Sequence, residues 1–316
     1  MTSGVGESAT DLTTYAKAQK TTGLLVVRSG RTLIERNWPA ADEAFATTFV
    51  RGRAADGALA EDVASQQKSL IAILVGQAVD RGLIDVMRPA GDFLGAGWTR
   101  TGPREERAIA VRHLLEMTSG LTEQLTYEAP PGARFFYNTP AYARLQRVLE
   151  VAAGQPLDAL TREWLTGPLG MADTVWRARP AELAQLSGNA WGLVTAPRDL
   201  AKLGRLVLEG GVAPDGTRLI SAREFAAILA PTAANPAYGR LWWLNGGAWS
   251  VDPQGARRDG PWVPTAPADL VLALGAQGRI LGVLPSRALV VVRLGAQPPA
   301  ADFAAQFWRR VMAAAE

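Results

Sequence analysis

Short apolar runs near both ends of the chain have the character of strands. Residues 22–38 hold two β-branched apolar runs around Ser29-Gly30-Arg31, and this pattern predicts a hairpin that turns at these three residues. Residues 39–60 show no clear periodicity and are expected to be irregular. Four more strands with short turns are predicted in the last third, at 241–245, 269–277, 279–285 and 288–295.

The middle of the chain has the three- and four-residue spacing of apolar positions that predicts helices. Residues 65–85 form the strongest of these segments, and an apolar character on nearly all sides indicates that this helix is buried. Gly82 is expected to end it, and Thr195 is expected to cap a helix over 195–211. Further helices are predicted at 111–121, 140–154, 156–168, 221–230 and 300–315, with a loose arm or helix at 1–20.

Strands at both ends with helices between them predict an α+β fold. We expect one antiparallel sheet, built from both termini and flanked by helices, with a mostly helical lobe inserted into it. The sheet lobe is placed at residues 1–60 and 190–316, and the helical lobe at 61–189. The two lobes are expected to form one unit with its site between them.

Size and charge narrow the class of function. A chain of 316 residues, 48% of them hydrophobic, can bury a large core. The net charge of +3 is spread along the chain without a block of Lys and Arg, so nucleic acid is not an expected partner. No apolar run of about 18 residues predicts a membrane span. The polar N-terminus lacks the apolar core of a signal peptide, from which we expect a cytoplasmic protein.

Scarce residue types limit the available chemistry. Cysteine is absent, which excludes disulfides, thiolate ligands and cysteine nucleophiles. His113 is the single histidine and lies in an apolar helical segment, where a packing or surface role is expected. Neither a metal site nor a cofactor is predicted. Proton transfer is left to Lys, Tyr, Asp and Glu.

Lysine is used sparingly in this sequence. Four of the 33 basic residues are lysines and the remaining 29 are arginines. Arginine stays protonated in proteins, whereas a buried lysine can lose its proton. Lys68, which lies in the apolar helix, therefore invites a chemical explanation, whereas Lys17, Lys20 and Lys202 need none.

Ser65-Gln66-Gln67-Lys68 is an S-x-x-K sequence at the start of the buried helix. Residues three apart share one helix face, so the Lys68 amine can reach the Ser65 hydroxyl. The helix N-terminus places backbone N–H groups and a positive dipole beside the serine, which favours an oxyanion. A desolvated lysine has a lowered pKa and can act as a base. The alternative is a helix-capping serine followed by an exposed lysine.

A second segment strengthens the catalytic interpretation. Tyr137, one of five tyrosines, precedes the helix that starts at Pro140 and can present its phenol to a site. With these motifs the sequence resembles the penicillin-recognising serine hydrolases, which include class C β-lactamases, D-Ala-D-Ala carboxypeptidases, family VIII carboxylesterases and 6-aminohexanoate-dimer hydrolase. The resemblance runs from about residue 22 to the end. Its matching segments are 65–85, 114–121, 137–139, 168–176, 191–211, 241–245 and 276–278.

The resemblance implies a β-lactamase/DD-peptidase-like fold and a role for each motif residue. Ser65 is the implied nucleophile, and Lys68 and Tyr137 share the proton transfers of a two-step acyl transfer. The backbone N–H groups of Ser65 and Arg279 are the implied oxyanion hole, and Thr139 is expected to bond near Lys68 or the substrate.

Two departures from the family pattern favour esters and linear amides. Thr139 stands where β-lactamases have an asparagine that helps to hold the β-lactam side chain. Ala276-Gln277-Gly278 stands where they have Lys-Thr-Gly, so the cation that binds a substrate carboxylate is missing. The adjacent Arg279 is a candidate replacement for that cation.

The pocket is expected to hold aromatic side chains, with a core position as the alternative for Trp242 and Trp243. The candidates are Tyr127, Trp191, Tyr238, Trp242 and Trp243. Arg198 and Asp199 are expected to serve as salt-bridge and cap residues.

These observations favour a metal-free serine hydrolase that cleaves esters or linear amides of small acyl compounds. One alternative is a β-lactamase or D-Ala-D-Ala carboxypeptidase, and another is a non-catalytic ligand-binding protein with the same fold. The expected partner is a small molecule, and a homodimer is left open.

Overall fold

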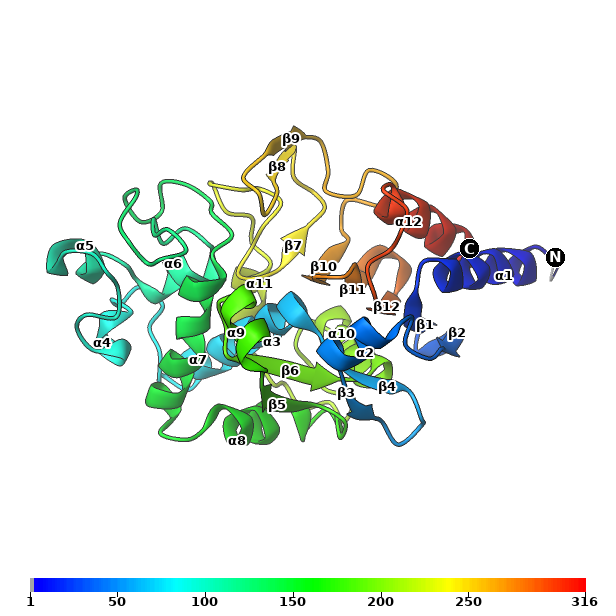
Figure 1. The fold of residues 1–316 in the computed structure, drawn as a ribbon, viewed down its shortest axis with the longest axis horizontal. Helices are drawn as coiled ribbons and strands as arrows, with labels where there is room; N and C mark the ends of the chain where they lie inside the picture. The colour runs from blue at the N-terminus through cyan, green and yellow to red at the C-terminus, as the bar shows by residue number, and fades with distance from the viewer. Residues whose placement is uncertain (1–2) are drawn as a thin grey trace.

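An antiparallel sheet of six strands collects segments from both ends of the chain (Figure 1). The computed structural model describes residues 3–316. β1 pairs with β2 on one side and with β12 on the other, which joins the first hairpin to the last strand. The sheet order is β2 (Arg31–Asn37), β1 (Thr21–Arg28), β12 (Leu289–Gly295), β11 (Arg279–Leu284), β10 (Val271–Gly275) and β7 (Trp243–Leu244). The predicted α+β class with a sheet from both termini is confirmed.

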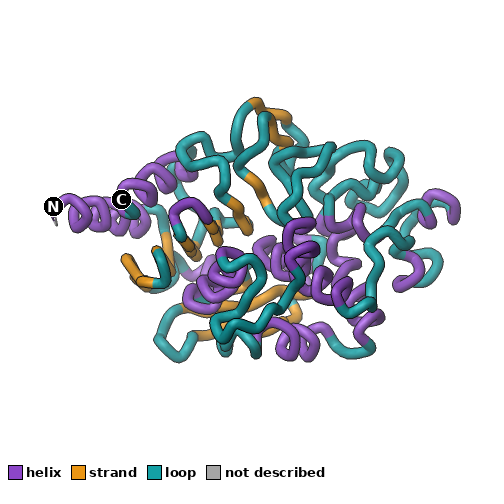
Figure 2. The backbone as a smooth tube through the Cα atoms, turned by 180° about the vertical axis from the view of Figure 1, so that it is seen from behind, coloured by secondary structure: helices purple, strands orange, loops and turns teal. Residues whose placement is uncertain are grey.

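Helices cover both faces of this sheet. A Cβ atom at Gly204 of α10 would lie 2.5 Å from Val290 Cγ1, so α10 packs closely on one face. A Cβ atom at Gly282 would lie 2.4 Å from the Trp308 ring, so α12 packs on the opposite face. α1 lies beside α12 where the two chain ends meet (Figures 1 and 2). These helices are α1 (Ser3–Ala18), α10 (Pro197–Leu208) and α12 (Phe303–Ala314).

A second antiparallel sheet of four strands lies below the centre of Figure 1. It corrects the prediction that residues 39–60 are irregular, because this segment holds a helix, one whole strand and the start of another. The helix begins at an N-cap in which Asp42 Oδ1 accepts a hydrogen bond from Phe45 N at 2.8 Å. The strands are only four or five residues long, too short for a periodicity to show. The elements are α2 (Glu43–Phe49), β3 (Val50–Arg53), β4 (Leu59–Asp62), β6 (Trp191–Thr195) and β5 (Val175–Ala178).

The second sheet takes strands from both sides of the predicted lobe boundary. β3 belongs to the 1–60 segment and β5 to the 61–189 segment, yet both join the sheet through β4 and β6. This sheet therefore ties the two parts together beside the start of α3. A separate two-stranded ribbon is formed by β8 (Trp249–Val251) and β9 (Arg257–Asp259).

The helix α3 (Gln67–Asp80) runs through the centre of the molecule (Figure 1). Every residue from Gln67 to Ala78 is buried, as its all-round apolar sequence predicts. The single turn η1 (Ala64–Gln66) leads into it. The remaining helical segments are α4 (Gly91–Leu94), α5 (Pro103–Arg107), α6 (Val111–Leu115), α7 (Thr139–Ala153), α8 (Leu157–Thr161), η2 (Arg162–Thr166), α9 (Ala181–Ser187), α11 (Ala222–Ile228) and η3 (Pro285–Arg287).

Several predicted boundaries differ from the structure. Thr195 ends β6, and α10 starts at Pro197, so the expected Thr195 cap is wrong. α6 ends at Leu115, well before Gly120, and Met117 then takes a left-handed φ of 57°. None of the helices within residues 3–316 combines the length and hydropathy needed to cross a bilayer.

Candidate active site

Ser65 lies in a turn between a strand of the second sheet and the central helix. β4 ends at Asp62, and Ala64 then adopts a φ of 50°, which is unfavourable for a residue with a side chain. The Asp62 carboxylate holds this turn, because its Oδ1 accepts a hydrogen bond from Ala64 N at 2.9 Å. The strand, the strained residue and the helix start together fix where the Ser65 hydroxyl points.

Lys68 lies one helical turn after Ser65, and its amine reaches the serine. The Lys68 Nζ to Ser65 Oγ distance is 2.9 Å, and Lys68 is only 2% exposed. Its Nζ also lies 5.0 Å from the ring centre of Tyr137 and 4.7 Å from that of Tyr142. Burial, and to a lesser degree the charge of Arg179, lowers the pKa of Lys68 from 10.5 to about 7.

Tyr137 approaches from the loop before α7, and the neighbouring residues fix that loop. Asn138 Oδ1 accepts a hydrogen bond from Ala141 N at 2.9 Å and so caps α7, while its Nδ2 donates to Leu121 O and Thr122 O at 2.9 and 2.8 Å. Burial raises the pKa of the Tyr137 phenol to about 12, against a smaller lowering by its hydrogen bond with Ser65. The phenol is therefore protonated at neutral pH.

The hairpin of β10 and β11 forms the wall across from the serine. Gln66 Nε2 donates to Ala273 O at 3.3 Å, and a Cβ atom at Gly275 would lie 2.5 Å from Val63 O. The end of β10 therefore packs directly against the turn that carries Ser65. The hairpin turn follows at Ala276 and Gln277, where Gln277 has a left-handed φ of 68°.

These elements surround a cavity of about 660 Å³. Ser65, Lys68, Tyr137 and Thr139 line its inner end, and α9 lies at another side of it. The lining residues are Phe49, Asp62, Ala64, Ser65, Gln67, Lys68, Glu123, Gln124, Tyr137, Thr139, Pro140, Arg179, Leu183, Gln185, Leu186, Ser187, Gly188, Asn189, Pro253, Ala276 and Gln277. The arrangement can activate a hydroxyl group beside a substrate-sized space.

A comparison with known families agrees with this geometry. The profile of the Beta-lactamase family matches residues 12–316. The chain belongs to the Beta-lactamase family. It is thus one of the penicillin-recognising serine hydrolases, as the motifs predict.

Proteins that are similar to this chain are named as a penicillin-binding protein, a 6-aminohexanoate-dimer hydrolase and a hydrolase with acyltransferase activity. Penicillin-binding protein 4 of Amycolatopsis lactamdurans is 28% identical over 208 residues, which cover 51% of this chain and 54% of the relative. The match thus spans about half the length of that relative. A Bacillus anthracis structure assigned as a 6-aminohexanoate-dimer hydrolase has a TM-score of 0.72 at 16% identity, over 96% of this chain and 81% of that one. EstCE1, a hydrolase with promiscuous acyltransferase activity, has a TM-score of 0.68 at 17% identity, over 99% and 98%.

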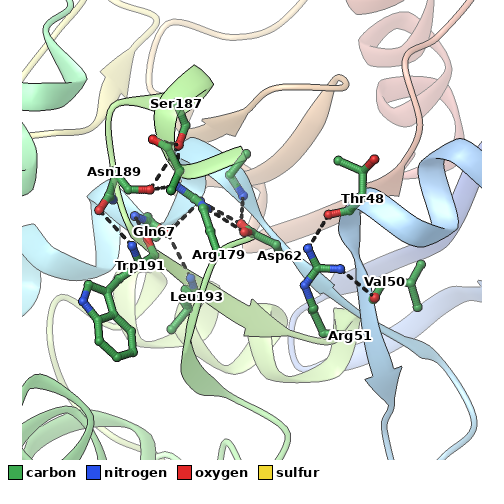
Figure 3. A network of polar contacts seen from close by, with 12 residues as sticks. Thr48, Val50, Arg51, Asp62, Gln67, Arg179, Ser187, Asn189, Trp191 and Leu193 are labelled. Atoms are coloured by element: carbon green, nitrogen blue, oxygen red, sulfur yellow. Dashed lines mark hydrogen bonds and ion pairs between the residues drawn. The ribbon is translucent and has the colours of Figure 1, made fainter. Parts of the chain in front are cut away.

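An ion-pair network close to Ser65 was not predicted from the sequence (Figure 3). Arg179 donates to both Asp62 oxygens, at 2.7 Å from Nε and 2.8 Å from Nη2, with side chains 5% and 2% exposed. Its Nη2 also donates to Gln67 Oε1 at 3.2 Å, and its Nη1 to Ser187 Oγ at 3.2 Å. Asp62 and Arg179 are 117 residues apart, and Arg179 is one of 29 arginines, so no sequence signal distinguishes the pair.

Arg279 does not replace the missing cation of the family's third motif. Its side chain is fully buried, and its Nη2 lies 3.1 Å from Glu61 Oε2, a carboxylate that also accepts from the Thr22 hydroxyl. Its guanidinium carbon lies 4.4 Å from the Phe49 ring centre. In the part of the chain that the structure describes, the cavity wall includes Ala276 and Gln277 but neither Gly278 nor Arg279.

The expected aromatic pocket residues divide into two groups, and neither lines the Ser65 cavity within residues 3–316. Tyr238, Trp242 and Trp243 are 1%, 0% and 3% exposed, so the core alternative holds for both tryptophans. Tyr238 and Trp243 pack behind Tyr137, with ring centres 6.2 and 6.0 Å away. Tyr127 and Trp191 are 45% and 48% exposed, and Trp191 lines a neighbouring cavity of about 490 Å³.

The remaining candidates have structural surroundings. His113 is buried, and its Nδ1 accepts a hydrogen bond from Ala110 N at 3.0 Å. Asp199 accepts from Asp173 N at 2.8 Å and pairs with Lys202 at 2.8 Å, and Arg198 pairs with Glu35. Gln277 turns its Oε1 to Gln297 N at 2.7 Å. No group of three or more His, Asp or Glu side chains within residues 3–316 is arranged to hold a metal ion.

Proposed function

We propose that this protein is a serine hydrolase that cleaves esters or linear amides of small acyl compounds through a Ser65 acyl-enzyme. The observation that carries the proposal is the 2.9 Å contact between Ser65 Oγ and a buried Lys68 whose pKa is lowered to about 7. A lysine with this pKa is substantially neutral at physiological pH and can accept a proton.

The acylation step follows from these positions. Neutral Lys68 takes the Ser65 proton while Oγ bonds to the substrate carbonyl carbon. We assign the oxyanion hole to the backbone N–H groups of Ser65 and Ala276, with Ala276 in place of the predicted Arg279, because Ala276 lines the cavity and Arg279 does not. As the bond to the leaving group breaks, the Lys68 ammonium group returns a proton to the departing oxygen or nitrogen, with the protonated Tyr137 phenol as relay.

Deacylation uses the same groups in the reverse order. Neutral Lys68, restored in the first step, takes a proton from a water molecule that attacks the acyl carbon. The bond to Ser65 Oγ then breaks, and the proton returns to Oγ. Because burial raises the pKa of Tyr137 to about 12, we assign Lys68 as the base and Tyr137 as a hydrogen-bond donor.

The charge of the cavity supports neutral substrates over β-lactams. Ala276 stands at the position of the family's cation, followed by the uncharged Gln277, and Arg279 is fully buried. Arg179, the one arginine that residues 3–316 place on the cavity wall, is already paired with both oxygens of Asp62. A substrate carboxylate would therefore lack a charge-assisted partner. The apolar Leu183 and Leu186 on the cavity wall suit an acyl chain instead.

A panel of three substrates tests the proposal: p-nitrophenyl butyrate, the linear dimer of 6-aminohexanoate, and nitrocefin. We expect turnover of the ester or the linear amide, and a loss of at least about 10³-fold in Ser65→Ala. Ser286→Ala, a serine whose partner is Asp269 on the surface, is the matched control and should keep full activity. Turnover that survives Ser65→Ala would contradict the mechanism.

The two alternatives give different results in the same panel. Rapid nitrocefin hydrolysis without ester or amide turnover would favour a β-lactamase or D-Ala-D-Ala carboxypeptidase. Stable binding without turnover would favour a ligand-binding protein. One observation argues against a ligand-binding protein. Burial of Lys68 beside a serine lowers the stability of the fold, and ligand binding alone does not require a buried lysine there.

A further inference from the structure

The ion pair of Arg179 and Asp62 connects three parts of the site (Figure 3). Asp62 Oδ1 accepts from Ala64 N at 2.9 Å, so the pair reaches the strained residue that precedes the nucleophile. Arg179 Nη2 donates to Gln67 Oε1 at 3.2 Å, so it also reaches the first residue of α3. Gln67 Oε1 in turn accepts from Leu193 N at 2.9 Å, which anchors the helix start on β6.

The same guanidinium also holds the segment that closes one side of the cavity. Arg179 Nη1 donates to Ser187 Oγ at 3.2 Å and to Asn189 O at 3.3 Å. α9 has no buried residue of its own, and Leu186 is 86% exposed. Side-chain bonds at the end of α9 therefore contribute more to its placement than packing does.

We propose that Arg179, acting through Asp62, is a positioning residue that holds the Ala64 turn so that Ser65 faces Lys68. The inference deepens the proposed function and rests on it. A purely structural ion pair needs no bonds beyond those between its two charged groups. The pair of Asp62 and Arg179 also bonds to Ala64 before Ser65 and to Gln67 after it. The bidentate fork requires arginine, because lysine cannot donate in two fixed directions.

Arg179 also acts on the charge state of Lys68. The Ser65 hydroxyl and the rings of Tyr137 and Tyr142 lie next to the Lys68 amine, and the charged side chains that line the same cavity are Asp62, Glu123 and Arg179. Burial is the larger cause of the lowered pKa of Lys68, and the positive charge of Arg179 is the second. Removing that charge should raise the pKa, so that the neutral base forms only at higher pH.

Steady-state kinetics of Arg179→Gln on the ester substrate test the positioning role. We expect kcat to fall about 10²-fold, because misplacement of the nucleophile by about 1 Å has this effect, while KM changes much less. Arg179→Lys should recover only part of the loss. Arg198→Gln, which removes an arginine from a pair with Glu35 outside the site, is the matched control and should keep the wild-type kcat.

A measurement without substrate separates this inference from the proposed function. The chain has only four lysines, so carbon-13-labelled lysine side chains give four resolvable NMR titrations, and Lys68→Met identifies the Lys68 signal. We expect a wild-type midpoint near pH 7 and an increase of about half a pH unit or more in Arg179→Gln. If the midpoint moves while Ser65→Ala keeps turnover, the proposed function fails and the action of Arg179 on the site stands.

Arg179→Gln leaves Asp62 buried without its partner and can fail to fold. The double variant Asp62→Asn, Arg179→Gln then replaces it, because an amide pair keeps an acceptor for Ala64 N without a buried charge. We expect it to fold, with a reduced kcat and a raised Lys68 midpoint. A folded Arg179→Gln or double variant with wild-type kcat and an unchanged midpoint would overturn the inference.

Discussion

The inner end of the cavity and its α9 side are built in opposite ways. At the inner end, Lys68 is 2% exposed, bonded to Ser65 and surrounded by tyrosine rings. On the α9 side, the helix buries no residue and leaves Leu186 86% exposed. The reactive groups therefore lie on a buried helix and a hydrogen-bonded turn, while part of the substrate surface lies on a thinly packed segment.

This difference suggests that the inner end of the cavity determines the reaction and the α9 side determines which substrates bind. Burial of Lys68 lowers its pKa, and its place on the buried helix fixes its distance from Ser65. A solvent-exposed side chain such as Leu186 can change without disturbing either property. Substitutions at the inner end should therefore change kcat and stability, and those on the α9 side should change KM.

The largest effect is expected for Lys68→Met, which keeps the size of the side chain and removes the amine. We expect kcat/KM for the ester to fall about 10³-fold, because the general base is lost. In the wild type, the rate should rise with pH through about 7 as Lys68 becomes neutral. The pH–rate profile of both proteins measures this, and the profile of Lys68→Met should lack that rise.

Lys68→Met should also gain stability at low pH. The unfolded chain binds the Lys68 proton up to pH 10.5, whereas the folded protein binds it only below about pH 7. The wild type therefore loses folding free energy as pH falls from 10.5 to 7, and the full cost is present below pH 7. Urea unfolding should show Lys68→Met to be more stable by a few kcal/mol at pH 6, with the gain vanishing toward pH 10.5.

Trp242 and Trp191 compare the core behind the site with an exposed position. Trp242 is 0% exposed and its indole N–H donates to Ser69 O at 3.1 Å, whereas Trp191 is 48% exposed. We expect Trp242→Ala to lower the free energy of unfolding by about 3–5 kcal/mol. Trp191→Ala should change it by about 0.5 kcal/mol or less. Equal losses in denaturant titrations would contradict the assignment of Trp242 to the core.

Tyr137→Phe tests whether the phenol adds to catalysis beyond its packing. The ring keeps its contacts with Tyr238 and Trp243, so the fold should be unchanged. We expect kcat to fall about 10²-fold, because a proton donor is lost while the lysine base remains. An unchanged kcat would show that Lys68 alone carries the proton.

The smallest effect is expected for Leu186→Glu on the α9 side. A charge there should raise KM for p-nitrophenyl butyrate about threefold to tenfold, because apolar contact with the acyl chain is lost. kcat should stay at the wild-type value. Leu33→Glu, at an exposed leucine on the distant strand β2, is the control. A fall in kcat with constant KM would show that α9 acts on the inner end.

Local sequence was sufficient to predict the contact between Ser65 and Lys68, whereas their proposed catalytic roles also required the scarcity of lysine and histidine and the resemblance to a family. Ser65 and Lys68 are three residues apart at the start of one helix, so helix geometry alone brings them together. Tyr137 required the resemblance to a family, because its distance along the chain does not predict proximity. The sheet from both termini was also predictable, since its long strands have clear apolar runs.

The rest of the site depends on pairings that sequence patterns do not encode. Asp62 and Arg179 meet because β4, β5 and β6 share a sheet, and the four-residue strand β4 starts within the segment expected to be irregular. An aromatic residue has the same sequence pattern in a core as in a pocket, which is why Tyr238 was wrongly placed in the pocket and why a core position had to stay open for Trp242 and Trp243. Arg279 was misplaced because adjacency in sequence does not tell which face of a strand a side chain takes.

Trapping of the acyl-enzyme tests the central claim most directly. The protein is mixed with p-nitrophenyl acetate, quenched in acid within milliseconds, and digested for peptide mass spectrometry. A Ser65 nucleophile predicts one acetyl group on the peptide that contains Ser65, and none in Ser65→Ala. Acetylation of another residue during turnover, or turnover without any covalent adduct, would contradict the account.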